Sequence, residues 1–233
     1  MASPVCVVAG FGPGNGAAFT RKFTSEGYRV AMLARSEAPL REMEAALPSA
    51  KGYAVDLTDP AAVEETFERI KRDLGPVDVL VHNAARWIMK PFLETTPEEL
   101  EKVWRANAMS FFLCARQAAD DMLASGRGAI IAIGATASVR GGPNFAAFAS
   151  SKAAMRSLAQ SMARGLGPRG IHVAHVVIDG AIDTPRVRAM IPGQKDDFFL
   201  KPDAIADAVF HLARQDPSAW TFELDVRPHG ESW

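Results

Sequence analysis

The sequence predicts a single-domain, doubly wound α/β fold, in which a parallel sheet of about seven strands carries helices on both faces. Three observations predict it: seven short apolar segments recur along the chain, helical stretches separate most of them, and the first segment runs directly into a glycine-rich turn. Such alternation is typical of a buried parallel sheet. The expected strands are 5–9, 29–34, 51–57, 77–83, 129–134, 172–178 and 220–226.

Helix signals lie between these segments. Asp59 followed by Pro60 is typical of a helix start, because an aspartate caps free N–H groups and proline fits the first turn. Apolar residues then recur at intervals of three and four, which predicts one buried face. The segment 96–99 has the spacing of a capping box and predicts a second helix over about 97–124. A third long helix is expected over about 145–167.

The composition is that of an ordinary globular protein, since 48% of the 233 residues are hydrophobic and 23% are charged. A formal net charge of -1 argues against nucleic acid or an anionic membrane as a partner. No apolar run approaches the roughly 18 residues of a transmembrane helix, and the amino terminus lacks the features of a secretory signal. Cys6 and Cys114 lie in apolar segments and are expected to be reduced, and no Cys/His cluster has metal-ligand spacing. The expected location is the cytoplasm.

No linker, repeat or low-complexity tract interrupts the chain, so residues 1–233 are expected to form one domain. Residues 183–200 are the least regular stretch, with two prolines, a glycine and adjacent aspartates. We expect this segment to be a mobile flap beside the substrate site.

The glycine-rich turn after the first expected strand predicts a Rossmann-type dinucleotide site. Glycines there allow a tight turn and a close approach of the backbone to a pyrophosphate. The helix that follows offers unpaired N–H groups and the positive end of its dipole. A glycine-rich loop without a ligand is the alternative. The residues expected to bind the cofactor here are Gly10, Gly12, Gly14, Asn15 and Gly16.

The end of the second expected strand indicates which dinucleotide is preferred. Enzymes that select NAD usually place an acidic residue there to bind the ribose 2′-hydroxyl. This chain has Arg35 and Ser36 instead, and a guanidinium beside a hydroxyl suits a 2′-phosphate. NADP(H) is therefore favoured over NAD(H), with a solvated surface arginine as the alternative. Asp56 and the adjacent Leu57 are expected at the adenine edge, with a turn-capping role as the alternative for Asp56.

Further motifs follow in a fixed order along the chain. They are Asn83 and Ala84 after the fourth expected strand, then Asn107, Lys152 and Thr184. With the glycines, in this order and spacing, the chain resembles the short-chain dehydrogenase/reductase family over essentially its whole length. The resemblance implies an NAD(P)-dependent oxidoreductase in which Asn83, Ala84, Lys152 and Thr184 bind the cofactor. It also implies that Asn107 and Lys152 belong to a catalytic tetrad.

The chain departs from the family at the two other members of that tetrad. The family places a tyrosine four residues before the lysine and a serine thirteen residues before the tyrosine. Here these positions hold Phe148 and Ala135, whose side chains donate no hydrogen bond. The two tyrosines of the chain, Tyr28 and Tyr53, lie on the adenosine side of the expected site. The departure resembles a divergent subgroup that keeps the lysine and replaces the tyrosine by phenylalanine.

Loss of the phenol removes a general acid worth roughly two to four powers of ten in rate. Reduction of an activated C=C bond or of an iminium fits such a site better than ordinary carbonyl reduction. Candidate replacements as proton donors are Ser138, Thr136, Asn144 and Lys152, the last through water and Asn107. A loop hydroxyl bonded to backbone is the alternative for Ser138, and a structural lysine is the alternative for Lys152. The alternative for the whole chain is a non-catalytic NADPH-binding sensor or assembly subunit.

Aromatic side chains, among them Phe145 and two phenylalanines of the flap, favour a small apolar or aromatic substrate, with core packing as the alternative. The family usually pairs the helices expected at 97–124 and 145–167 between subunits, so we expect a homo-dimer or homo-tetramer. His172 and His175 lie in or at the start of a buried strand, where structural histidines are commoner than catalytic ones.

Overall fold

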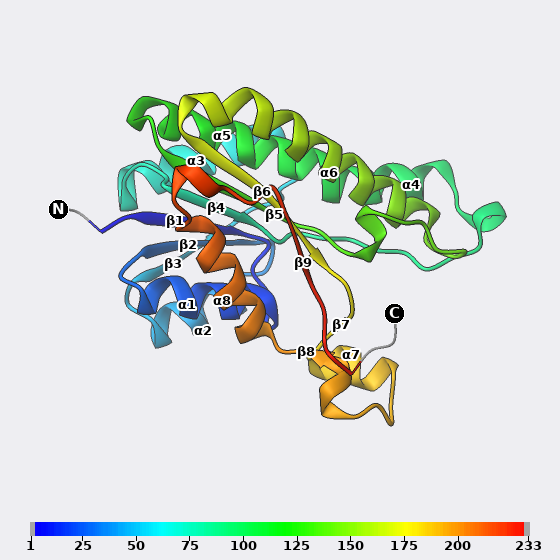
Figure 1. Ribbon diagram of the computed structural model, residues 1–233. Coiled ribbons are helices and arrows are strands. Elements are labelled where there is room, and N and C mark those ends of the chain that lie inside the picture. Colours follow the sequence, from blue (N-terminus) through cyan, green and yellow to red (C-terminus); the bar gives the residue numbers. More distant parts are fainter. Residues whose placement is uncertain (1–2, 231–233) are drawn as a thin grey trace.

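The computed structural model describes residues 3–230, which fold into three layers around a parallel sheet (Figure 1). Within these residues the main sheet has seven strands in the order β3-β2-β1-β4-β5-β6-β9, as the predicted doubly wound fold requires. The strand order reverses between β1 and β4, and ligands of such sheets bind at the carboxyl ends of the strands beside the reversal. The strands are β1 (Val5–Ala9), β2 (Arg29–Ala34), β3 (Ala50–Ala54), β4 (Val79–His82), β5 (Gly128–Ile133), β6 (Ile171–Ile178) and β9 (Glu223–Val226).

Helices cover both faces of the sheet (Figure 1). One face carries α1 (Asn15–Ser25), α2 (Glu37–Ala46) and α8 (Pro202–Ala213). The other face carries α3 (Pro60–Leu74), α4 (Pro97–Trp104), α5 (Ser110–Ser125) and α6 (Ala146–Leu166). Alternate residues of β1 enter the two cores: Val7 packs in the core beneath α3, α5 and α6, and Val8 in the core above α1 and α8. Both cysteines are buried free thiols, as predicted.

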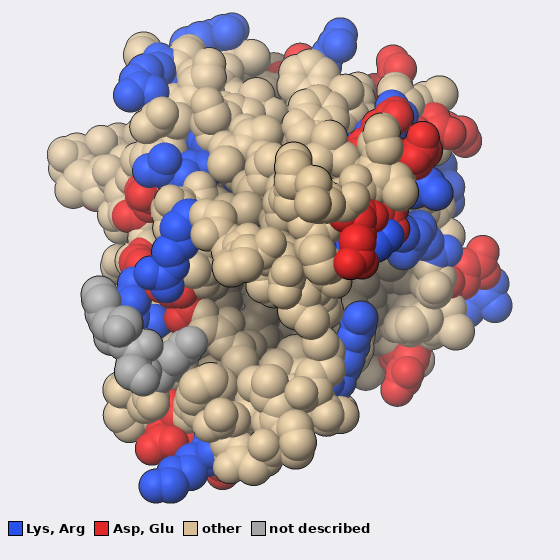
Figure 2. Space-filling view, turned by 90° about the vertical axis from the view of Figure 1, so that its right-hand side faces the viewer, with Lys and Arg blue, Asp and Glu red and all other residues tan. Residues whose placement is uncertain are grey.

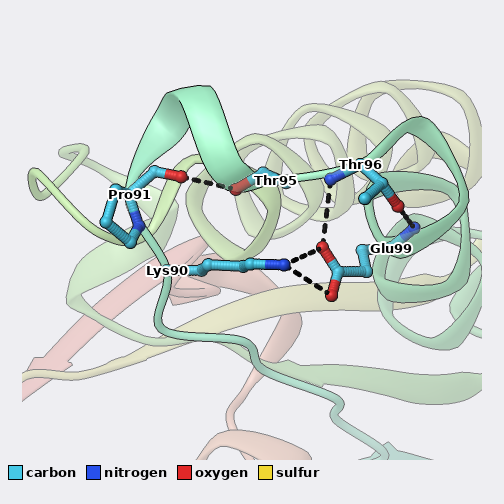
Figure 3. A network of polar contacts seen from close by, with 5 residues as sticks. All are labelled: Lys90, Pro91, Thr95, Thr96 and Glu99. Carbon is cyan, nitrogen blue, oxygen red and sulfur yellow. Dashed lines mark hydrogen bonds and ion pairs between the residues drawn. The ribbon is translucent and has the colours of Figure 1, made fainter.

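The predicted helix starts are confirmed. Asp59 accepts two N–H groups of the first turn of α3, at 3.0 and 3.2 Å. At the start of α4, Thr96 Oγ1 accepts the N–H of Glu99, and the Glu99 carboxylate accepts the N–H of Thr96 (Figure 3). The same carboxylate binds Lys90 Nζ at 3.1 and 3.2 Å. The hydrogen bond from Thr96 N–H is the main cause that lowers the pKa of Glu99, and the bond from Lys90 is the second. The loop after β4 is thereby tied to α4.

The helix predicted over 97–124 is interrupted. After α4 ends at Trp104, the π-helical turn η2 (Arg105–Met109) intervenes before α5 begins. Asn107 lies in this turn, and its side chain bonds the backbone of Arg86 in the loop after β4. The chain is helical over the predicted range, and only the π turn within it was not predicted, because local helix propensity carries no information about tertiary contacts. Such π turns occur frequently at functional sites.

The expected flap, residues 183–200, contains regular structure. Within it and at its borders, α7 (Pro185–Met190) and the turn η5 (Asp196–Phe198) lie between two short strands, β7 (Ala181–Ile182) and β8 (Phe199–Leu200), which pair in parallel. Arg188 binds Asp183 and Asp196, each through a contact of 2.9 Å. The segment is folded on itself, and its mobility stays a prediction. The other short helical turns are η1 (Phe92–Glu94), η3 (Thr136–Ser138), η4 (Gly167–Arg169) and η6 (Pro217–Ala219).

Between residues 3 and 230, no helix has both the length and the apolar character needed to cross a bilayer. The same part of the chain contains no group of three or more His, Cys, Asp or Glu side chains placed to hold a metal ion.

Candidate active site

The glycine-rich turn is joined to the end of β4. Gly10 has φ 95°, a conformation that favours glycine, and a Cβ added there would lie 2.3 Å from the backbone nitrogen of Ala84. Asn83 Nδ2 donates to the Gly10 carbonyl at 2.8 Å. The structure therefore brings Gly10, Asn83 and Ala84 into one unit at the reversal of strand order, where their predicted role requires them.

The amino end of α1 opens beside this turn. No side chain of the described residues caps the helix; Ala17 N–H donates to Gly12 O, and the N–H groups of Asn15 and Gly16 remain available for an anion. Asn15 is 6% exposed, and its buried Oδ1 makes no hydrogen bond within residues 3–230. A Cβ at Gly16 would approach Phe11 Cα to 2.8 Å, whereas one at Gly12 would meet no atom within 4 Å. The open N–H groups fit a bound diphosphate, whereas the unpaired Asn15 Oδ1 is an acceptor and needs a donor instead.

The end of β2 is held against the same turn, because the N–H groups of Gly10 and Phe11 both donate to Leu33 O, at 3.0 and 2.8 Å. Arg35 and Ser36 follow, and both are exposed. Neither side chain makes a hydrogen bond or ion pair with another described residue. An exposed guanidinium and hydroxyl without hydrogen-bond partners fit both the predicted 2′-phosphate contact and the solvated arginine that was its alternative, so the contact stays a prediction.

Asp56 caps a turn, which is the alternative that the sequence indicated for it. Its Oδ1 accepts from Thr58 N and Thr58 Oγ1, at 2.9 and 2.8 Å, and these bonds are the main reason that its pKa is lowered. The carboxylate is exposed, whereas Leu57 is buried. A contact of either residue with adenine stays a prediction.

Lys152 lies at the end of the sheet, 2% exposed. Its Nζ donates to Ile133 O at 2.8 Å and forms no ion pair with a carboxylate of residues 3–230. The ring of Phe148, one turn earlier on α6, has its centroid 6.0 Å from Nζ. Burial lowers the pKa of Lys152 to about 8. Neither a solvated lysine nor a carboxylate-paired one describes this side chain.

Asn107 connects the π turn to the loop after β4 and to α6. Its Oδ1 accepts from Arg86 N at 2.8 Å, and its Nδ2 donates to Arg86 O at 2.9 Å and to Ser151 Oγ at 2.7 Å. Ser151 in turn donates to the Phe148 carbonyl at 2.8 Å. Sequence reasoning missed Ser151, whose only signal was its place beside Lys152. Water held by Asn107 stays a prediction.

The hydroxyl groups of the loop after β5 bind within the loop and to Asp179, the residue that follows β6. Ser138 Oγ is buried and accepts the N–H of Ala135 at 3.1 Å, which is the alternative given for it. Thr136 Oγ1 donates to the carboxylate of Asp179, which also pairs with Arg227 at 3.1 Å. Thr136 uses its hydrogen on Asp179, whereas Ser138 only accepts in its bond with Ala135, so Ser138 as a proton source stays a prediction.

Thr184 joins the flap to the glycine turn. Its Oγ1 accepts the N–H of Val187 and caps α7, while a Cβ on Gly14 would lie 2.9 Å from its methyl group. The guanidinium of Arg186 on α7 lies 5.9 Å from the ring centroid of Trp87 in the loop after β4. Figure 2 shows this side of the molecule, with a hollow whose surroundings are largely uncharged and have Lys and Arg side chains at the edges.

Two histidines lie beneath the site. His82 is fully buried against Ser110 and Phe111 of α5, so it does not reach the adenosine side. His175 is also fully buried, and its Nδ1 lies 3.2 Å from Glu223 Oε2. The sequence indicated burial of His175 but not its partner, since 48 residues separate the two along the chain.

Comparison with known proteins agrees with this geometry. A family model described as short chain dehydrogenase matches residues 4–195. A short-chain dehydrogenase/reductase of Armillaria gallica is 35% identical over 189 residues, which cover 78% of this chain and 72% of that protein. The crystal structure of a short-chain dehydrogenase from Rhodopseudomonas palustris has a TM-score of 0.83 and 35% identity, covering 97% of this chain and 99% of that one. A metagenomic short-chain oxidoreductase in complex with NADP has a TM-score of 0.84 and 31% identity, covering 99% of both chains.

A parallel sheet with a glycine turn at its strand reversal, and a buried lysine at the neighbouring strand ends, defines an oxidoreductase of the dinucleotide-binding α/β class. The matched region extends from β1 into the flap. The chain belongs to the short-chain dehydrogenase/reductase family, whose members act on small molecules.

Proposed function

We propose that this chain is an NADPH-preferring oxidoreductase of a divergent short-chain subgroup, in which Phe148 and Ala135 replace the tyrosine and serine of the tetrad. The observation that carries the proposal is the environment of Lys152, a buried ammonium against the Phe148 ring with no carboxylate partner in the described residues. With a pKa of about 8, this group is charged at neutral pH and can release a proton there. The site thus keeps an acid although it lacks the phenol.

The residues at the strand ends have separate roles in this proposal. The turn at Gly10 and the amino end of α1 bind the diphosphate, and Arg35 with Ser36 binds the 2′-phosphate. Asn83 holds the turn in place, and Thr184 covers it from the flap. Lys152 binds the nicotinamide ribose. A reduced nicotinamide bound here supplies the hydride.

The missing donors restrict the substrate. Ala135 and Phe148 offer no hydrogen bond to a carbonyl oxygen, so an acceptor that is already polarised is favoured. An iminium carries its own positive charge, and an activated C=C bond needs its proton on carbon after hydride addition. Phe145 and Phe148, with ring centroids 6.5 Å apart, favour an apolar or aromatic substrate.

The second candidate is an NADPH-binding sensor or assembly subunit without turnover. It is favoured by the same two residues, since the side chains of Ala135 and Phe148 can neither donate nor accept a proton. Both functions require NADPH binding. They differ in whether any acceptor oxidises the bound nucleotide.

Cofactor preference is tested by calorimetric titration with NADPH and NADH. We expect tighter binding of NADPH, and Arg35→Ala should weaken it about tenfold or more, because a charge-assisted phosphate contact is lost. NADH binding should not change. Arg41→Ala, which removes an exposed arginine already paired with Glu37, is the matched control. Equal affinities of the wild-type protein for the two nucleotides would refute the preference.

Turnover is tested by following the absorbance of NADPH with ketone, enone and iminium acceptors. Oxidation by enones or iminium ions, slowed strongly by Lys152→Met, would support the enzyme. Binding of NADPH without oxidation by any acceptor would support the sensor instead.

We also propose a homo-oligomer in the cytoplasm, either a dimer or a tetramer. Large apolar side chains are exposed on α4 and α5, including Leu100 at 44%, Trp104 at 39% and Phe112 at 41%. Such a surface suits a second copy of the chain. Light scattering gives the mass in solution, and a monomer at micromolar concentration would contradict the proposal.

A further inference from the structure

A groove of about 1060 Å³ lies at the amino ends of the strands, at the edge of the sheet opposite the glycine turn and on the side where β1 begins in Figure 1. Val5, Arg29 and Gly128, the first residues of β1, β2 and β5, line it. Lys152 binds Ile133 O at the other end of β5, about 16 Å away at roughly 3.3 Å per residue. The groove is therefore separate from the candidate active site.

The charged side chains that line this groove are three arginines and one aspartate. Arg127 Nη2 lies 4.0 Å from Asp78 Oδ1, and Asp78 Oδ2 accepts the Val5 N–H at 2.9 Å. Arg29 and Arg214 form no ion pair with a described residue. The wall of the groove thus has an excess of positive charge, which a bound anion would balance.

Arg29 has unused donors at this wall. Its Nη2 donates to Ser3 O at 3.0 Å, whereas its Nε is buried and has no hydrogen-bond partner among residues 3–230. A guanidinium carries five N–H groups in a planar fork, which matches the oxygen atoms of a carboxylate or a phosphate. Because buried donors are normally paired, the free Nε–H indicates a missing acceptor.

A fixed aromatic ring forms another part of the wall. The indole of Trp220, in the segment before β9, stacks on the His172 ring with centroids 4.9 Å apart and planes 3° apart. Trp220 Nε1 donates to Gln215 O at 3.3 Å. The ring nitrogens of His172 contact the carbonyls of Leu212 and Thr221. The uncharged lining residues are otherwise mostly Gly, Pro, Ala and Val, so a planar apolar ring fits this wall.

We propose that this groove is a second ligand site, for a small molecule that carries a carboxylate or a phosphate on a planar ring. Arg29, Arg127 and Arg214 bind the anionic group, and the ring lies against Trp220. The volume of the groove is comparable with the roughly 300–1,000 Å³ of ligand pockets. This site requires neither bound nucleotide nor turnover, so it does not depend on the proposed function.

The site is tested by NMR of the indole N–H groups of the nitrogen-15-labelled full chain. The chain has four tryptophans, whose signals are assigned by single substitutions to phenylalanine. The probe is 2-naphthoate, and 2-naphthylmethanol provides the same ring without charge. We expect 2-naphthoate to shift the Trp220 signal in a saturable way and to leave that of Trp104, at the end of α4, unchanged. The alcohol should bind at least about tenfold more weakly, because it forms no charge-assisted bond with a guanidinium.

Arg127→Met together with Arg214→Met is the test variant, because both side chains are exposed and their loss should leave the fold intact. It should raise the Kd for 2-naphthoate about tenfold or more. Arg169→Met is the matched control. Arg169 is an exposed arginine between Pro168 and Gly170 of the groove wall, but it does not line the groove itself. Thermal unfolding monitors the fold of each variant.

An unmoved Trp220 signal at millimolar 2-naphthoate would overturn the proposal, as would equal affinities of the double variant and the wild-type protein. Displacement of the probe by NADPH would also overturn it, because the probe would then occupy the candidate active site. A mass in light scattering that falls in the double variant would show instead that a second copy of the chain covers the groove. Nucleotide binding and oxidation are measured separately, so failure of this site is distinguishable from failure of the proposed function.

Discussion

Phe148 places its ring against the buried Lys152, and in the proposed site this ring replaces a tyrosine whose hydroxyl group would exchange a proton there. The ammonium of Lys152 still has the ring face within 6.0 Å, so its surroundings are apolar and aromatic instead of anionic. At this scale the sequence was informative, because the loss of two donors is visible in the residue types alone. The consequence for the lysine was not visible, since its burial depends on β5 and α6 meeting.

Phe148→Tyr together with Ala135→Ser should create carbonyl reductase activity. The two hydroxyl groups would restore a donor pair beside Lys152, and a general acid contributes roughly a hundredfold or more to rate. Ketone-dependent oxidation of NADPH is the measurement. Ala135→Ser alone is the matched control, because it adds the serine hydroxyl without a phenol. No gain in the double variant would show that the rest of the tetrad is not arranged for catalysis.

Individual histidines were harder to predict than the lysine. His82 follows an apolar run and precedes Asn83, so the sequence alone does not say whether its ring faces the core or the cofactor. In the structure its ring turns into the core beneath α5. Side chains alternate along a strand, but this alternation tells which face of the sheet a residue occupies only when the register of the neighbouring strands is known.

In the proposed function, nucleotide binding depends on the turn between β1 and α1. Gly10 is fixed by its conformation and by the backbone of Ala84, whereas Gly12 has open space around it. The sequence presents both simply as glycines of one loop. The structure therefore distinguishes Gly10, where a Cβ would collide with the backbone of Ala84, from Gly12, where a Cβ would meet no other atom within 4 Å.

Gly10→Ala should lower the free energy of unfolding by about 2 kcal/mol or more, because it adds strain at a positive φ and displaces the backbone at Ala84. Gly12→Ala is the matched control and should change stability little. Urea denaturation measures both variants. Equal stabilities of the two proteins would contradict the described packing of the turn.

Element boundaries followed from the sequence where they depend on local chemistry. The caps at Asp59 and Thr96 are examples, since both bond within their own first turn. The π turn at Asn107 was not predictable, because it depends on a bond to Arg86, 21 residues away. The two-stranded pairing of β7 with β8 was missed for the same reason.

At the scale of the whole molecule, the doubly wound parallel sheet with helices on both faces followed from alternating segments and a glycine turn, whereas the order of its strands was not predicted. The polar pairs buried in the core could not be predicted from the sequence. Buried polar partners such as His175 and Glu223 lie on strands that become neighbours only in the finished sheet.

Stability should fall as the pH is lowered from about 6.5. Folding lowers the pKa of His82 to about 3 and of His175 to about 4, in both cases mainly through burial, from an ordinary value of 6.5. Between these values the unfolded chain binds more protons, so each histidine contributes a slope of up to about 1.4 kcal/mol per pH unit. Urea denaturation from pH 7.5 to 5 measures it, above the range of the lowered carboxylate pKa values. His175→Asn should flatten this slope, and an unchanged slope would exclude His175 as a source.

The contact between the Thr184 methyl group and Gly14 bears on the order in which ligands bind. In the proposed function the flap covers the diphosphate site and borders the substrate site, so we expect it to open before the dinucleotide can enter. A small acceptor needs far less clearance. We expect compulsory-order kinetics, with the nucleotide first to enter and last to leave. Product-inhibition patterns that are competitive only between the two nucleotide forms would bear this out, and random addition would refute it.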